Sequence, residues 1–533
     1  MPPFAQRGTF PLSAEVTAAG CSVFMKTRRG TGRPGSAAAE KNARPMRGLS
    51  AAGVLLFLVA AGCSTVENSH LQKAEMLSAY ERGDNAAVLE EIHYKLRDPA
   101  WYNTSVVNTG DEVMWRLEAG SLNFHLGNFQ ESIEQFKIAE KLIAEYDDRA
   151  RISVRDVGAE AGGAVTNLNT LPYRGFCRDR IALSIYKSLA YLGTGDESAF
   201  RAQLRRLRSE QKKIQDDYRE FFEQEKAKLQ EAEKRNLKIA GDSRNADFNA
   251  GLKEVREIAH RGYGNFLNPM AIFLSGLGSL RDGNFDNARI DFQRLYEAMP
   301  GNPMIQRYYV TVLNKADRPV PEALHQVKPF AFPLERECVF VIFANGRSAA
   351  FRQVAVSFPI MAAWPMCEFY RAPFGSLEVE ADGGKSSSVI LADMDGILAQ
   401  EFEERLPGMT ARIVLGTLLK EGAYYGGLVA IGNAGMDPTV KLIAMLAAGI
   451  GGAAYRSAMN TADTRSWELL PKEFQLAQFP MPENREVTMV LRGNGGRRVE
   501  TVRIPAESRS AIIFVSAPSA RNVRCHVLPI KSR

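Results

Sequence analysis

The first half of the chain arranges apolar and polar residues with the period of an α-helix. Between residues 71 and 303, apolar side chains recur at i, i+3 and i+4, and four such stretches are interrupted by a Gly-Asp or Gly-Asn dipeptide. The interruptions are Gly83-Asp84, Gly127-Asn128, Gly195-Asp196 and Gly283-Asn284. Because these dipeptides are typical of tight turns, the pattern predicts four helical pairs.

The clearest pair spans Ile272–Pro303. Small Gly276 lies in its first helix, and Ala288 and Phe292 lie on the inward face of its second. This arrangement resembles the tetratricopeptide repeat, whose period is about 34 residues. Stacked pairs bury their apolar faces against each other, so we expect a tetratricopeptide-like α-solenoid over residues 63–320.

The turn glycines are spaced irregularly, which predicts insertions in the array. Arg151–Tyr173 is typical of a long loop, and residues 197–237 are typical of one long charged helix. The basic run Arg201–Arg208 could contact anionic lipid headgroups. A solvated face with ion pairs to the acidic residues that follow is the favoured interpretation.

The second half, after a proline-rich linker at Arg318–Pro333, changes to the period of β-strands. The predicted strands are Cys338–Phe343, Arg352–Phe358, Ser376–Glu380, Ser387–Leu391, Glu486–Leu491, Val499–Ile504, Ala511–Val515 and Val523–Leu528. Helical patterns at Ile397–Glu404, Thr410–Tyr425 and Val440–Ala458 separate the two groups. This order predicts an α+β domain over residues 334–533, a mostly antiparallel sheet with a helical insertion at 397–460.

The Gly/Ala-rich segment Val440–Ala458 is too short for a membrane span of about 20 residues, and charged residues bracket it. Its small residues favour close packing against the helix at Thr410–Tyr425. Membrane insertion or oligomeric assembly through this segment is the alternative.

The N-terminal region carries a targeting signal. Leu49–Gly62 is an uncharged apolar stretch that follows Arg47 and ends just before Cys63. The surrounding residues resemble a bacterial lipobox, although Ala60 stands where leucine is usual. We expect residues 1–62 to be removed, with translation starting at Met46 or Met25, and Cys63 to be lipidated. A plain secretory signal is the alternative. Ser64 indicates the outer membrane, with the protein facing the periplasm.

The distribution of charge along the chain bears on the class of partner. The 533-residue chain has a formal net charge of +6, but residues 1–62 hold eight basic and only two acidic side chains. The remainder carries 59 of each sign. A balanced body has no electrostatic footprint for nucleic acid, so we expect no nucleic-acid partner.

Cysteine and histidine spacing gives no indication of a metal centre. Cys177, Cys338, Cys367 and Cys525 form no CxxC pair, and no two histidines lie three or four residues apart. Cys338 and Cys525 lie in strand-like runs, where an envelope compartment permits a disulfide. Two buried free thiols are the favoured interpretation.

Two stretches imitate catalytic motifs. Asp393 and Asp395 follow an apolar run, as in the DxDG sequence of haloacid dehalogenase-type phosphotransferases, but no downstream lysine and acidic motif completes a magnesium site. A strand that ends in a helix N-cap explains the same residues. Gly449–Ala454 fits the GxGxxA pattern of dinucleotide sites, but its flanks are helical. We therefore expect no catalytic residue, cofactor or metal, and a hydrolase in the C-terminal domain is the alternative.

Three further motifs carry a family resemblance. They are Tyr173-Arg174-Gly175-Phe176 with Arg178-Asp179-Arg180, Asn268-Pro269 with Phe273–Gly276, and Ala462-Asp463-Thr464-Arg465-Ser466-Trp467-Glu468-Leu469-Leu470-Pro471. Together they resemble an uncharacterised family of bacterial tetratricopeptide-containing lipoproteins, which implies a lipid-anchored envelope protein without an established activity.

The last of these motifs supplies the candidate site residues. We expect Asp463 and Arg465 to form a charge-assisted pair and Trp467 to be a buried anchor, with a ligand cleft as the alternative. The expected function is a scaffold that binds a partner protein or peptide of the cell envelope through its helical repeats.

Overall fold

The computed structural model describes residues 69–97, 110–156, 172–234, 246–264, 266–357, 361–410, 413, 461–494 and 496–531. These residues belong to one compact unit, Ala61–Arg533. The signal region with Cys63, the Val440–Ala458 segment and the GxGxxA pattern lie outside the described residues.

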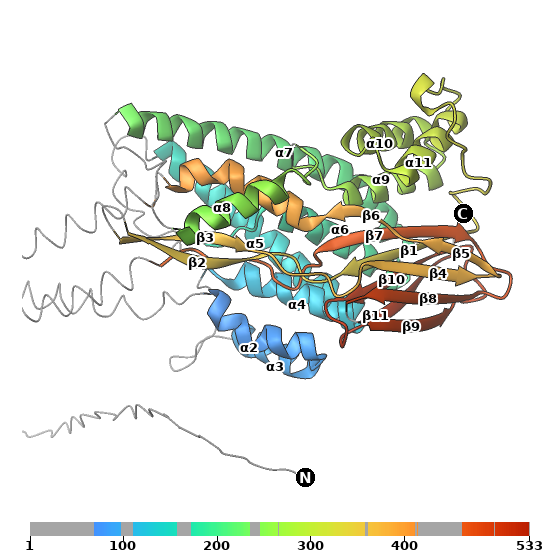
Figure 1. Cartoon of the computed structure of the whole chain (residues 1–533), viewed down its shortest axis with the longest axis horizontal. Coiled ribbons are helices and arrows are strands. Elements are labelled where there is room, and N and C mark those ends of the chain that lie inside the picture. Colours follow the sequence, from blue (N-terminus) through green and yellow to red (C-terminus); the bar gives the residue numbers. More distant parts are fainter. Residues whose placement is uncertain are drawn as a thin grey trace, which may run out of the picture. The chain divides into compact units, whose positions relative to one another are not determined.

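All four predicted helical pairs are present as antiparallel hairpins (Figure 1). They are α2 (Ser69–Arg82) with α3 (Asn85–Leu96), α4 (Glu112–Leu126) with α5 (Phe129–Asp156), α6 (Cys177–Gly193) with α7 (Glu197–Lys234), and α9 (Pro269–Arg281) with α10 (Phe285–Ala298). Each hairpin also packs against the next along the chain. Two helices outside the four pairs were not predicted: α8 (Ala246–Ala259) and α11 (Pro303–Lys315).

The Gly-Asx dipeptides have two tasks at the hairpin turns. Gly283 has a φ of 73°, in the left-handed region that glycine adopts without steric cost. Asn284 then caps α10, because its side-chain oxygen accepts the N–H of Asn287 at 3.1 Å. Asp196 caps α7 in the same way. One dipeptide therefore ends a helix and begins the next.

Small residues bring the two helices of a hairpin close together. A Cβ atom added to Gly276 would lie 2.9 Å from the Phe292 ring, and one added to Gly120 would lie 2.5 Å from the Phe136 ring. Both distances are shorter than a normal contact. The glycine at the small position is therefore required by the packing of the opposite aromatic ring.

The described strands form three sheets. The five-stranded sheet has the order β11-β10-β1-β7-β6, the four-stranded sheet the order β5-β4-β8-β9, and β2 and β3 form a hairpin. Their bounds are β1 Cys338–Asn345, β2 Ala350–Ser357, β3 Met361–Glu368, β4 Ser376–Ala381, β5 Gly384–Ser387, β6 Val389–Asp393, β7 Glu473–Pro480, β8 Glu486–Gly493, β9 Gly496–Arg503, β10 Ser510–Ala517 and β11 Arg524–Ile530. Among the described strands, only β1 and β10 pair in parallel. The α+β class with a mostly antiparallel sheet is thus observed.

The strand prediction was wrong in two respects. The run predicted as one strand, Ser387–Leu391, is divided at Ser388 into β5 and β6, which belong to different sheets. In addition, β3 and β7 were not predicted. β7 lies inside the five-stranded sheet, and seven of its eight residues are buried. Its polar and apolar residues alternate over Glu473–Leu476, but the alternation is interrupted at Ala477.

Alternating residues of the five-stranded sheet enter two different cores. Phe340 and Ile342 of β1 face a core shared with the helices, whereas Val339 and Val341 face a core shared with the four-stranded sheet. The layers are therefore helices, five-stranded sheet and four-stranded sheet (Figure 1). A third cluster lies between the β2–β3 hairpin, α8 and a helix over residues 394–410.

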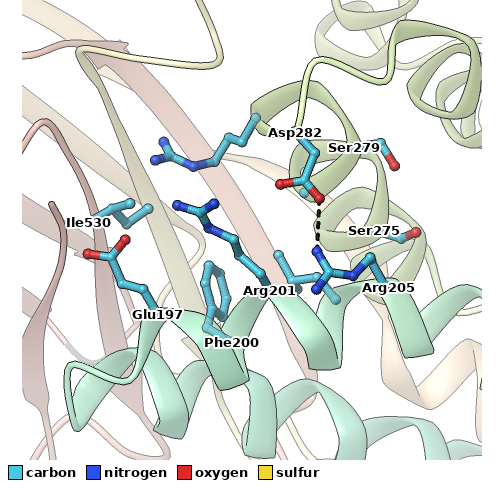
Figure 2. Close-up of a pocket in the computed structure, with 11 residues that line it drawn as sticks. Glu197, Phe200, Arg201, Arg205, Ser275, Ser279, Asp282 and Ile530 are labelled. Atoms are coloured by element: carbon cyan, nitrogen blue, oxygen red, sulfur yellow. Dashed lines mark hydrogen bonds and ion pairs between the residues drawn. The ribbon is translucent and has the colours of Figure 1, made fainter. Parts of the chain in front are cut away.

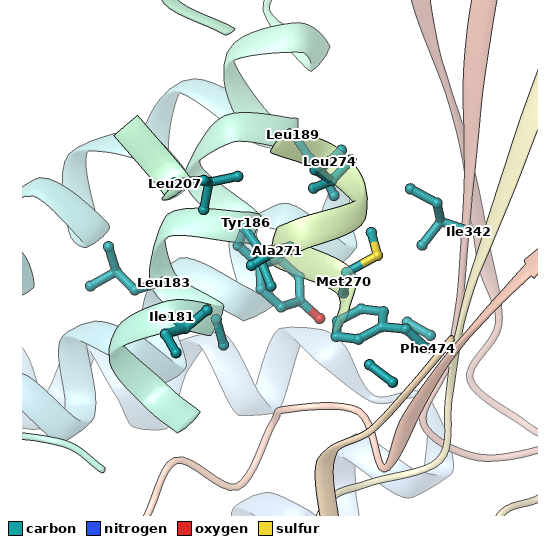
Figure 3. Packing of buried hydrophobic residues seen from close by; sticks show 14 of the residues in the cluster. Ile181, Leu183, Tyr186, Leu189, Leu207, Met270, Ala271, Leu274, Ile342 and Phe474 are labelled. Carbon is teal, nitrogen blue, oxygen red and sulfur yellow. The ribbon is translucent and has the colours of Figure 1, made fainter. Parts of the chain in front are cut away.

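The first helix of each of three hairpins lies against the sheet. In α4, α6 and α9 most side chains are buried, and aromatic rings cross from helix to strand. Phe124 contacts Phe514 at 4.9 Å between ring centroids, and Phe273 contacts Phe340 at 6.1 Å. Figure 3 shows Tyr186 and Met270 of this core beside Ile342 and Phe474. The core is continuous across the boundary predicted between residues 320 and 334.

A search of the described helices for a membrane-crossing segment finds none with the required length and apolarity.

The substitution Gly120→Ala tests the close approach of α4 to the Phe136 ring of α5. The added methyl group would collide with the Phe136 ring, so we expect a loss of about 1–3 kcal/mol in the free energy of unfolding, measured by urea denaturation. The matched control is Gly301→Ala, where a Cβ meets no atom within 4 Å. Equal midpoints for the two variants would contradict the assignment.

Candidate functional site

Two of the three motifs that carry the sequence resemblance, the first and the third, meet at a buried junction. The first motif forms the start of α6, and residues 461–470 form an irregular segment that leads into β7. Trp467 is fully buried, and its indole N–H donates to the Ser121 hydroxyl of α4 at 3.1 Å. Its ring lies 5.8 Å from Phe136 and 6.0 Å from Tyr186. Trp467 therefore anchors this segment among the helices.

Arg178 joins the two motifs directly. It is fully buried, and its guanidinium donates to Asp179 at 3.0 Å and to the Ser348 hydroxyl at 2.7 Å. Two backbone oxygens, of Ala349 and Trp467, accept further N–H groups at 3.3 and 3.4 Å. Burial alone would lower the pKa of Arg178, but Asp179 acts in the opposite direction and the net shift is upward.

Asp179 also contacts Tyr173 and Phe176, which precede it in the same motif. Its second carboxylate oxygen accepts the Tyr173 hydroxyl at 2.5 Å and the Phe176 N–H at 3.0 Å. Burial, and then the Asp179 charge, raise the pKa of Tyr173 well above its usual value. The phenol therefore stays protonated and acts as a donor.

The N-terminus of α6 receives a carboxylate from the helix over residues 394–410. Glu401 accepts the N–H groups of Cys177 at 2.9 Å and Arg178 at 3.3 Å, where the helix dipole favours negative charge. Arg405 donates to Glu401 at 2.6 Å and to the Tyr218 hydroxyl at 3.1 Å. This contact ties α6 and α7 to the second half of the chain.

Asp463 and Arg465 form the expected charge-assisted pair. Two guanidinium nitrogens donate to the two Asp463 oxygens, each at 2.8 Å. The remaining terminal nitrogen donates to Asp111, just before α4, at 2.9 Å. The guanidinium also lies 5.8 Å from the Tyr173 ring centroid. The pair therefore holds the loop against the helical half.

A second buried ion pair was missed by the sequence analysis. Lys73 of α2 donates to Glu118 of α4 at 2.6 Å, and both side chains are fully buried. Glu118 also accepts the N–H groups of Glu468 and Leu469, and Lys73 donates to the Ser466 carbonyl. Burial raises the pKa of Glu118, and Lys73 opposes that shift. The sequence carries no specific signal for this pair, because the helix around Trp115 also contains Glu112, Arg116, Asn123 and His125.

The DxDG aspartates are engaged by other parts of the fold. Asp393 accepts the Gly396 N–H at 3.0 Å, the helix-capping contact that the sequence suggested. Asp395 is fully buried, accepts the Ala349 N–H at 2.7 Å and forms an ion pair with Lys472. The lysine that the motif lacks in sequence is thus nearby in space, but it neutralises Asp395 in a buried contact.

Two histidines that are far apart in sequence lie together. His526 donates from Nε2 to the His125 carbonyl at 3.0 Å, while His125 contacts Ser516 at 2.9 Å and Asn522 at 2.8 Å. Burial lowers the pKa of His125 to about 4. Within the described ranges no group of three or more metal-ligating side chains is present. Cys338 and Cys525 are both free thiols.

An open pocket lies away from this junction, between α7, α9 and the end of β11 (Figure 2). Its enclosed volume is about 20 Å³, and the rest of the depression is open to solvent. Its lining residues are Glu197, Phe200, Arg201, Leu204, Arg205, Ser275, Gly278, Ser279, Arg281, Asp282 and Ile530. None of them was a predicted site residue. Arg201 and Arg205 belong to the basic run for which ion pairs within α7 were favoured. The structure instead pairs Arg205 with Asp282 of the next hairpin.

Comparisons with protein-family models, with curated proteins and with solved structures found no match to this chain. The junction combines buried charges that are each matched by a partner, which is typical of a structural tie between segments.

The substitution Glu118→Gln tests whether the Lys73–Glu118 pair stabilises the junction. The change removes the nearer of two buried carboxylates around Lys73, Glu118 at 2.6 Å, and leaves Glu468 at 3.8 Å. We therefore expect a loss of about 1.5–3 kcal/mol in unfolding free energy by urea denaturation, the range for a hydrogen bond to a charged group. Glu134→Gln is the matched control, because Glu134 pairs with Lys137 on the surface, where about 0–1 kcal/mol is expected. A loss below about 1 kcal/mol for Glu118→Gln would show that the Lys73–Glu118 pair does not stabilise the contact between the two segments.

The pH dependence of the free energy of unfolding tests whether His125 is buried as a neutral imidazole. A folded pKa of about 4 against 6.5 means that the stabilisation is complete above pH 6.5 and declines as pH falls toward 4, by up to about 3 kcal/mol. His125→Asn should lower the slope of unfolding free energy against pH in this window. Exposed His325→Asn serves as control and should keep the original slope. Parallel slopes for all three proteins would refute this assignment.

Proposed function

We propose that the protein is a non-enzymatic scaffold, anchored by a lipid at Cys63 to the periplasmic side of the outer membrane, and that its tetratricopeptide-like helical stack binds a partner protein or peptide. Four consecutive hairpins with Gly-Asx turns support the likeness to tetratricopeptide repeats. The lipobox-like sequence at Cys63 supports the anchor.

One observation supports the choice of the face that would bind a partner. The first helices α4, α6 and α9 are covered by the protein's own five-stranded sheet. A peptide cannot occupy that face without displacing a dry core that includes Phe124, Tyr186 and Phe273. This face of the helical stack is therefore filled within the chain.

The second helices form the outer face and carry a different surface. In α10 only Ala288, Asp291, Phe292 and Leu295 are buried, and the other side chains are at least partly accessible. Ile290 of this helix is 40% exposed. We therefore assign partner binding to the outer face formed by α5, α7 and α10.

Site-specific photo-crosslinking in cells tests this assignment. A photoreactive residue at Ile290 should yield one adduct of defined mass, whereas the same residue at Val499 of β9, which is 44% exposed, should not. The Cys63→Ser variant should lose the incorporation of labelled fatty acid and the membrane fractionation, and the Ile290 adduct with them.

Adducts from position 499 but not from position 290 would move the binding surface to the four-stranded sheet. Unchanged fatty-acid labelling in Cys63→Ser would refute the anchor.

A further inference from the structure

The first helical hairpin begins close to the proposed lipid anchor. Cys63 and Ser69, the first residue of α2, are six residues apart, so the chain between them spans at most about 22 Å when fully extended. α2 itself has 14 residues and is about 21 Å long. A bilayer that holds the lipid of Cys63 therefore lies within about one helix length of the start of α2.

The end of α3 lies beside the start of α2. The two helices are antiparallel (Figure 1), and the Nζ atoms of Lys73 and Lys95 lie 5.6 and 5.7 Å from the centroid of the same Trp115 ring. The turn of this hairpin is at the other end of α2, where the Ser519 hydroxyl of the β10–β11 loop donates to the Glu81 carbonyl at 2.6 Å. The tether therefore holds the end of α3, rather than the sheets, near the bilayer.

The end of α3 presents an aromatic side chain to solvent. Tyr94 is 38% exposed, and the Arg97 guanidinium carbon lies 3.6 Å from its ring centroid. An amphipathic tyrosine ring prefers the boundary between acyl chains and headgroups, and a guanidinium is attracted to phosphate. The last two turns of α3 carry no formal net charge, because they hold two acidic and two basic side chains: Glu90, Glu91, Lys95 and Arg97. This end of the hairpin therefore matches a zwitterionic phospholipid surface.

We propose that the end of the first hairpin, formed by the start of α2 and the end of α3, rests on a zwitterionic phospholipid surface with Tyr94 among the headgroups. This inference rests on the lipid anchor of the proposed function. It directs the sheets away from the bilayer. Because α10 belongs to the last of the four hairpins, its exposed Ile290 stays accessible to a partner protein.

Spin-label relaxation on vesicles tests this orientation. The full lipidated chain is reconstituted in phosphatidylcholine vesicles that contain a nickel-chelating lipid, and a nitroxide is attached through a non-natural amino acid at His93 or at Val499. His93 is exposed next to Tyr94, and Val499 of β9 is 44% exposed. Because nickel at the headgroups relaxes only nearby nitroxides, we expect enhanced relaxation at position 93 and no enhancement at position 499.

Two variants test the contribution of Tyr94, each with the nitroxide at position 93. Tyr94→Ser should lose most of the enhancement, because the chain keeps its tether but loses the side chain that contacts the headgroups. Ile390→Ser is the matched control, since Ile390 of β6 is also a large apolar side chain, 47% exposed, and this variant should keep the full enhancement. Addition of phosphatidylglycerol to the vesicles should leave the relaxation unchanged.

Three results would overturn the proposal: equal relaxation at positions 93 and 499, an unchanged enhancement in Tyr94→Ser, or an enhancement that appears only with phosphatidylglycerol. The last would assign this surface to anionic lipids. Incorporation of labelled fatty acid is measured on the same samples. Where the fatty acid is present, such a result contradicts the orientation alone and leaves the anchor standing, whereas its absence would refute the anchor and the orientation together.

Discussion

The guanidinium of Arg178 stays charged inside the protein because oxygens from separate segments surround it. Removing such a group from water costs several kcal/mol, which only close, well-oriented acceptors can offset. Asp179 comes from the same helix, but Ser348 and Ala349 follow β1, and the Trp467 carbonyl belongs to the loop before β7. The position of α6 and the positions of both loops are therefore set together, because the displacement of any one would leave a buried charge unmatched.

The same constraint recurs at the other contacts between the halves of the chain. Glu118 of α4 accepts two backbone N–H groups from the loop that carries Trp467, and Glu401 receives the N-terminus of α6. In each case a charge on one half satisfies backbone groups of the other. The helical hairpins and the sheets consequently form one body, although the chain changes its hydrophobic period between them.

The packing of the helices on the sheet limits which surfaces can bind another molecule. A stack of helical pairs with a free inner face offers a concave groove, but here the five-stranded sheet fills that face with apolar contacts. What is left to other molecules is the outer row of helices and the polar rim where α7 and α9 meet β11.

Local sequence patterns predicted some features of the structure, and tertiary packing decided others. The sequence by itself determined the helical hairpins, because Gly283 and Asn284 act on residues next to them in the chain: one adopts a left-handed turn, the other caps the following helix. It also indicated the Asp463–Arg465 pair, whose members are two residues apart. It did not reveal β7, where the alternation of polar and apolar residues is interrupted at Ala477, or the pairing of Lys73 with Glu118, Asp395 with Lys472 and His125 with His526. Those contacts join residues far apart in the chain, and only the packing of helices on the sheet brings them within hydrogen-bonding distance.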